Sequence, residues 1–105
     1  MIMKSNTVSE LTTLDSILEL IGRKLLDLRI KKGYTSHADF AKDHALPRIQ
    51  YWRMEKGKSN ITLRSLCRVL AVHNLTIEDL FESIAKEKRS SIDNSVFNFR
   101  IEHKA

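Results

Sequence analysis

The chain has 105 residues, of which 42% are hydrophobic, and its 18 Lys and Arg against 13 Asp and Glu give a net charge of +5. This length predicts one domain with short extensions, and the low Gly and Pro content excludes a collagen-like or disordered chain and favours an all-α globule. A single cysteine, Cys67, excludes an internal disulfide framework. No apolar run has the length of a signal peptide or a membrane span, so we expect a cytoplasmic protein with no membrane partner.

The positive charge is concentrated in the middle of the chain. Residues 1–20 carry a net charge of −2, residues 21–58 carry +6, and residues 59–105 carry +1. A basic middle segment suits a surface that meets DNA phosphates, and charge alone is equally compatible with a solvated basic face.

The N-terminal part predicts a helix that Thr12 or Thr13 caps. Its apolar positions recur three and four residues apart, at Leu14, Leu18, Ile21, Leu25 and Leu28. Ile17 and Leu20 widen this stripe, which therefore packs either on a partner subunit or on the chain's own domain. Gly22 marks a helix break or a close helix contact.

Two short helices joined by a tight turn follow. The Lys31–Gly33 segment ends the first helix, and Ser36 with Asp39 caps the next one, whose Phe40–Ala41 pair faces inward. Pro47 suits the first turn of a third helix that ends at Gly57. The pattern of this segment is therefore helix, turn, helix.

The third helix has two different faces. Tyr51 and Met54 point inward on it, whereas its outward residues are Arg48, Ile49, Gln50 and Arg53. Such a basic, hydrogen-bonding face suits the reading of DNA bases.

Two further helices complete a five-helix core in this interpretation. Thr62 caps a helix whose apolar face is formed by Leu63, Leu66, Cys67 and Leu70, so that Cys67 is expected to be buried. Thr76 with Asp79 caps a last short helix that ends near Phe81.

The C-terminal part predicts a linker and a strand. Lys86 to Asp93 is charged and rich in Ser, which is typical of a linker. Val96 to Glu102 alternates between apolar and polar residues like a β-strand, which must pair with something, most simply with the same strand of a second subunit.

These elements together resemble the Cro and C1 repressor helix-turn-helix family, also called the XRE family. The resemblance covers residues 21–83 and rests on the following motifs: Ile21-Gly-Arg-Lys-Leu-Leu-Asp-Leu-Arg29, Phe40-Ala41, Arg53-Met-Glu-Lys-Gly57, Leu63 to Leu70, and Leu75-Thr-Ile-Glu-Asp-Leu80. It implies a five-helix, lambda-repressor-like DNA-binding domain at 21–83. An N-terminal helical extension (1–20) precedes this domain, and a linker with a short C-terminal strand (84–105) follows it.

The resemblance also implies roles for individual residues. Glu55 is expected to pair with Arg29 and to hold the third helix against the first. The outward positions Arg48, Ile49, Gln50 and Arg53 are expected to contact bases, unless the arginines contact phosphates only. The expected phosphate contacts are His37, Trp52, Lys56, Lys58, Ser59, Asn60, Thr62 and Arg64.

Three features depart from the family pattern. Ala45 replaces the usual glycine of the turn, so His44 or Ala45 is expected outside its preferred φ region or in a mildly strained turn. One residue is inserted near Ser36. Trp52 stands where small or polar residues are usual, and it either stacks on the DNA backbone or packs on the second helix.

The sequence gives no support for an enzyme or for a cofactor. Cys67 and the four histidines show no metal-ligand spacing, and neither a Gly-rich phosphate loop nor a nucleophile elbow is present. Two functions remain. The first is a sequence-specific regulator of transcription, a repressor that binds double-stranded DNA as a homodimer. The second is an antitoxin-like module that neutralises a toxin partner and regulates its own operon.

Overall fold

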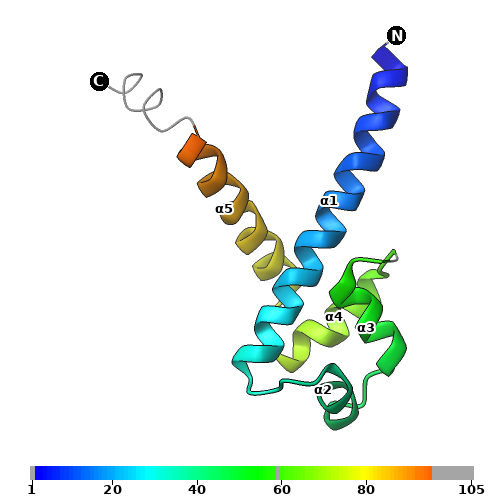
Figure 1. The fold of residues 1–105 in the computed structure, drawn as a ribbon, viewed down its shortest axis with the longest axis vertical. Coiled ribbons are helices and arrows are strands. Elements are labelled where there is room, and N and C mark those ends of the chain that lie inside the picture. Colours follow the sequence, from blue (N-terminus) through cyan, green and yellow to red (C-terminus); the bar gives the residue numbers. More distant parts are fainter. Residues whose placement is uncertain (1, 59, 96–105) are drawn as a thin grey trace.

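The computed structural model describes residues 2–58 and 60–95, and within these ranges every regular element is a helix. The five helices are α1 (Ile2–Lys31), α2 (His37–Asp43), α3 (Arg48–Lys56), α4 (Leu63–Val72) and α5 (Ile77–Ser95). The predicted all-α, five-helix class is therefore confirmed. Figure 1 shows α2, α3 and α4 grouped beside the C-terminal half of α1, while the N-terminal half of α1 and the end of α5 diverge from this group.

One hydrophobic core joins the five helices. From α1 it receives Ile21 and Leu25, which lie four residues apart and therefore on one face of the helix. The other helices contribute Phe40, Ala41, Tyr51, Met54, Leu66, Val69, Leu70, Leu80 and Ile84. Since the contact between α1 and α3 is the most extensive of any pair of helices described, the position of α3 depends on α1.

Side-chain caps fix where α2 and α5 begin. Ser36 Oγ accepts a hydrogen bond from the backbone N–H of Asp39 at 3.2 Å, as predicted. Thr76 and Asp79 form a reciprocal pair, in which each side chain accepts from the other residue's backbone N–H, at 3.1 and 2.9 Å. These bonds satisfy backbone donors that have no partner inside the helix.

The start of the first helix differs from the prediction. α1 begins at Ile2 instead of Thr12 or Thr13, and it continues through Gly22 without a break. Gly22 is instead the site of a close helix contact, because a Cβ atom there would overlap the carbonyl oxygen of Glu55 and lie 2.8 Å from that of Met54. From Ile2 onward, the extension expected at residues 1–20 is thus continuous with the first helix of the core.

The end of the fifth helix also differs. α5 continues to Ser95, so the segment Lys86 to Asp93, predicted to be a linker, is helical. Ile84, 3% exposed, anchors this helix in the core, and Glu87 pairs with Lys24 of α1 at 2.9 Å. The strand predicted at Val96 to Glu102 lies outside the described residues.

The buried face of α4 is rotated relative to the prediction. Leu66, Val69 and Leu70 are buried, whereas Leu63 is 66% exposed and Cys67 is exposed. The prediction of a buried Cys67 was therefore wrong. The reason is that Leu66, Val69 and Leu70 are the residues by which α4 joins the hydrophobic core, so Leu63 and Cys67 face outward.

No helix in the described ranges combines the length and apolar character that crossing a bilayer requires.

Two histidines pack on the aromatic centre of the core. The Phe40 ring is stacked on His73 at 5.4 Å and lies 4.8 Å from the His44 ring. Within the described residues, the Nε2 atoms of both histidines are buried without a hydrogen-bond partner. Burial lowers the pKa of His73, and the nearby side chains of Lys32 and His44 lower it further.

This depressed pKa of His73 predicts that the protein loses stability in mild acid. The unfolded chain binds a proton at His73 near its ordinary pKa of 6.5, whereas the folded chain resists protonation. The free energy of unfolding is therefore highest above pH 6.5 and falls as the pH drops below that value. Urea unfolding between pH 8 and pH 5 measures this slope, and His73→Gln is expected to reduce it. An unchanged slope in that variant would exclude His73 as its source.

Candidate nucleic-acid interface

The turn between α2 and α3 sets the direction of α3. Ala45 adopts φ +55°, the left-handed conformation expected where the family has a glycine, at a cost of order 1 kcal/mol. The backbone N–H of Leu46 then donates to the carbonyl of Ala41 at 2.8 Å, and Pro47 with φ −64° precedes the first residue of α3. The turn is thus closed by one backbone hydrogen bond and by a residue whose φ is fixed.

The outer face of α3 is exposed and takes no part in the hydrophobic core. Arg48, Gln50 and Arg53 are exposed, and Ile49 is 64% exposed. With Asn60 they line one shallow, open hollow on the surface. The structure therefore gathers all four expected base-contacting residues on one accessible face.

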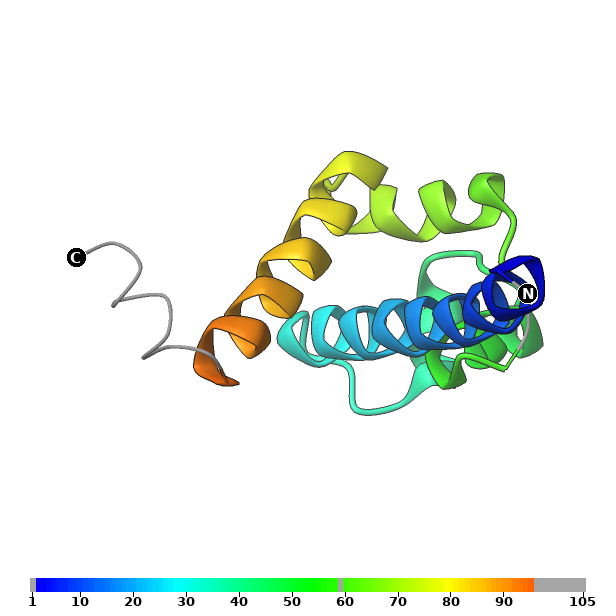
Figure 2. The ribbon, with the colours of Figure 1, turned by 90° about the horizontal axis from the view of Figure 1, so that it is seen from above.

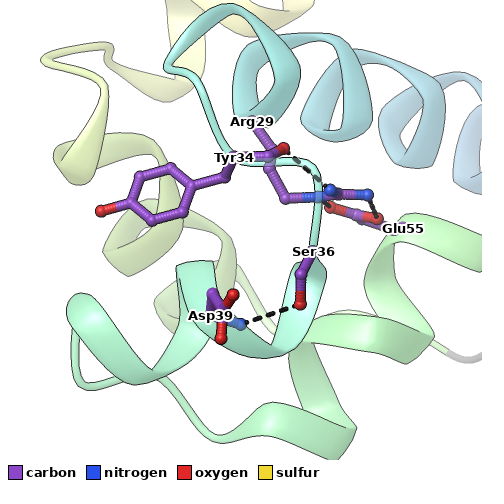
Figure 3. A network of polar contacts seen from close by, with 5 residues as sticks. All are labelled: Arg29, Tyr34, Ser36, Asp39 and Glu55. Atoms are coloured by element: carbon purple, nitrogen blue, oxygen red, sulfur yellow. Dashed lines mark hydrogen bonds and ion pairs between the residues drawn. The ribbon is translucent and has the colours of Figure 1, made fainter.

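The inner side of α3 is fixed to α1 by a buried ion pair. Figure 3 shows Arg29 reaching from α1 to Glu55, where Nε and Nη2 donate to the two carboxylate oxygens at 2.7 and 3.1 Å. Arg29 Nη1 donates to the carbonyl of Tyr34 at 3.0 Å. The Arg29 and Glu55 side chains are 8% and 5% exposed, and the hydrogen bonds that Arg29 donates to Glu55 raise the pKa of Arg29. The buried pair holds α3 in a defined orientation against α1.

Two glycines allow the close approach of α1 and the C-terminal end of α3. Gly22 lies directly against the backbone of Met54 and Glu55. Gly57 ends α3 with φ +64°, and a Cβ atom there would lie 3.1 Å from the carbonyl oxygen of Leu18. The two helices thus meet through their backbones, and the buried ion pair joins them beside this contact.

Trp52 lies between two other residues that were expected to contact phosphates. Its ring is half-buried, 6.5 Å from the ring of His37 at the start of α2, and Lys56 Nζ lies 6.0 Å from its centre. The indole therefore packs across the α2–α3 junction and places a histidine and a lysine beside the outer face of α3.

The other expected phosphate contacts follow α3 in the chain. Lys58, Asn60 and Arg64 are exposed, and Ser59 lies outside the described residues. Thr62 has a structural role in addition, because its Oγ1 accepts a hydrogen bond from the backbone N–H of Ser65 at 3.1 Å and caps α4.

Ser65 is a residue of this surface that sequence reasoning did not identify. Its Oγ accepts a hydrogen bond of 2.8 Å from Gln50 Nε2, and another of 3.0 Å from Thr62 Oγ1. The only signal in the sequence was its spacing, three residues after the capping Thr62.

Comparison with known proteins relates this chain to a control protein. No family model matches the chain, and no solved structure is significantly similar to it. The control protein C.MunI of Mycoplasma sp is 38% identical to it over 66 residues, which cover 63% of this chain and 89% of that protein. The chain belongs to the control-protein family. As a member of this family it is a regulatory helix-turn-helix protein, and α2, the turn and α3 form its helix-turn-helix.

In this control protein, the structure places most of the predicted interface residues on or beside one surface. The four outward residues of α3 lie together, with His37, Trp52 and Lys56 at the junction with α2 and Asn60 lining the same hollow. Arg29 and Glu55 are paired behind that surface.

Proposed function

We propose that this control protein regulates transcription as a repressor of the Cro and C1 (XRE) type, which binds specific double-stranded DNA sequences and catalyses no reaction. The observation that carries this proposal is the exposed face of α3, formed by Arg48, Ile49, Gln50 and Arg53 and supported from behind by the Arg29–Glu55 pair. Membership of the control-protein family supports a role in DNA-binding regulation.

The side chains on this face have the chemistry that the major groove requires. An arginine such as Arg48 or Arg53 donates two parallel hydrogen bonds to O6 and N7 of guanine, and the amide of Gln50 suits adenine. Ile49 offers an apolar contact for the methyl group of thymine. Phosphates on either side of the groove would be bound by Lys56, Lys58, Asn60 and Arg64.

The proposed regulator acts as a homodimer. Two copies related by a two-fold axis would place their α3 helices about 34 to 36 Å apart, one turn of DNA. Support comes from α1, whose N-terminal half leaves the helical group (Figure 1), lies apart from the C-terminal end of α5 (Figure 2) and carries Leu14 at 42% exposure. Light scattering at micromolar concentration is expected to give the mass of two chains. A monomer that also binds DNA as a single copy would contradict the dimer.

The second interpretation, an antitoxin-like module with a toxin partner, stays a prediction, and so does the cytoplasmic location. A toxin gene beside the gene for this chain would favour the antitoxin interpretation.

If α3 contacts bases as proposed, the Arg48→Ala variant is expected to lose affinity for the selected DNA. Removing one bidentate contact is expected to lower the affinity for a duplex selected by the wild-type protein about 5- to 150-fold, equivalent to about 1 to 3 kcal/mol. Fluorescence anisotropy at several salt concentrations measures both the affinity and the number of ionic contacts.

Arg23→Ala is the matched control for this experiment. Arg23 is an exposed arginine of α1 that lies near Glu87 of α5, away from α3, so its loss is expected to change the affinity little. Equal effects of the two substitutions, or an affinity that does not depend on salt, would contradict the proposed interface.

A further inference from the structure

We propose that Ser65 is a positioning residue that fixes the side-chain amide of Gln50 and thereby sets the base preference at the base pair facing Gln50. This inference rests on the proposed function, since it concerns the same interface. Its basis is the 2.8 Å hydrogen bond from Gln50 Nε2 to Ser65 Oγ, which links the outer face of α3 to the first turn of α4.

Ser65 is well placed to act as a fixed support. Its backbone N–H donates to Thr62 Oγ1 at 3.1 Å, and Thr62 Oγ1 donates to Ser65 Oγ at 3.0 Å. Leu66, the next residue, is 2% exposed and anchors this turn of α4 in the core. The serine hydroxyl therefore keeps its position independently of DNA, and Gln50 is held against it.

This hydrogen bond selects what Gln50 presents to a base. A glutamine amide has two N–H donors and one oxygen acceptor. With one N–H directed to Ser65, the other N–H and the oxygen remain, and this donor and acceptor pair matches N7 and the N6 amino group of adenine. An exposed glutamine without this partner rotates freely and can present either end of its amide to any base, which weakens the discrimination.

Ser65 is not the residue that caps α4. The N-terminal turn of α4 is capped by Thr62, whose Oγ1 receives the Ser65 N–H. The Ser65 hydroxyl is not required for that bond, so its removal leaves the cap in place. A variant at this position can therefore fold normally and still lose the link to Gln50.

The test measures base preference one position at a time. Sites selected from random DNA by the wild-type protein supply a reference duplex and its single-base variants. A well-placed bidentate contact discriminates about 5- to 150-fold between bases. In Ser65→Ala, the preference for adenine at one base pair of each half-site is expected to fall below about 3-fold, with the other positions unchanged. Ser65→Thr, which keeps the hydroxyl, is expected to retain the preference.

A double-mutant cycle separates positioning from a direct contact. Gln50→Ala should abolish the same preference, and adding Ser65→Ala to it should change nothing further. Ser83→Ala on α5 is the matched control and should select the wild-type sequence. The inference is overturned if Ser65→Ala keeps every wild-type preference, or if it weakens binding equally for all duplexes as the loss of a phosphate contact would. A wild-type protein that selects no sequence would instead contradict the proposed function, and this inference with it.

Discussion

Replacement of Glu55 by alanine is expected to lower the free energy of unfolding by about 3 to 5 kcal/mol. The reason is the burial of its partner: Arg29 is 6% exposed, and two of its three guanidinium nitrogens donate to the Glu55 carboxylate. Without the carboxylate, a buried positive charge has no counter-charge and loses two hydrogen bonds. Urea unfolding followed by helical circular dichroism measures this loss.

Glu87→Ala is the matched control for this prediction. Glu87 also forms an ion pair, with Lys24 at 2.9 Å, but the two side chains are 43% and 25% exposed. Solvent screens such a pair, so its loss is expected to cost at most about 1 kcal/mol. A Glu55 variant as stable as the Glu87 variant would show that the buried pair does not hold α3 against α1.

The second large effect is expected for Gly22→Ala. In an exposed helix this change would stabilise the helix by about 1 kcal/mol. Here the added Cβ atom would overlap the Glu55 carbonyl oxygen and lie 2.8 Å from that of Met54. Because these atoms belong to a helical backbone, α3 must move away from α1, and a destabilisation of about 3 kcal/mol is expected, the upper end of the usual range for overpacking.

Whether Gly22→Ala raises or lowers the stability of the protein is the decisive result. Ser16→Ala, at an exposed position of the same helix, serves as the control and is expected to raise the thermal midpoint slightly because alanine favours helix. A Gly22→Ala protein with a raised midpoint would contradict the close contact between α1 and α3. With the expected loss, the same variant should also bind DNA more weakly, because α3 is displaced together with the Arg29–Glu55 pair.

Local signals in the sequence predicted the central part of the fold well. Ser36, Thr62 and the Thr76–Asp79 pair begin the helices that they were expected to begin, because a side chain that satisfies free backbone N–H groups acts within one turn. The left-handed φ of Ala45 is one of the alternatives predicted from the departure of the turn from the family pattern.

The ends of the chain were harder to predict. A cap signal at Thr12 or Thr13 and a charged, Ser-rich stretch from Lys86 are weak preferences, and neither residues 2–21 nor residues 77–95 contain Gly or Pro to stop a helix. Both helices therefore continue beyond the expected bounds. The orientation of α4 and the link between Gln50 and Ser65 depend on how helices pack, which spacing along one helix does not specify.

The central claim is that the outer face of α3 enters the major groove of DNA, and methylation interference tests it most directly. Dimethyl sulfate methylates guanine at N7, in the major groove, and adenine at N3, in the minor groove. This placement of α3 predicts that methylation of N7 at specific guanines in each half-site blocks binding by the wild-type protein, and that methylation of at least one of these guanines no longer affects binding by the Arg48→Ala variant. Interference only from methylated adenine N3, with binding indifferent to guanine N7, would contradict it.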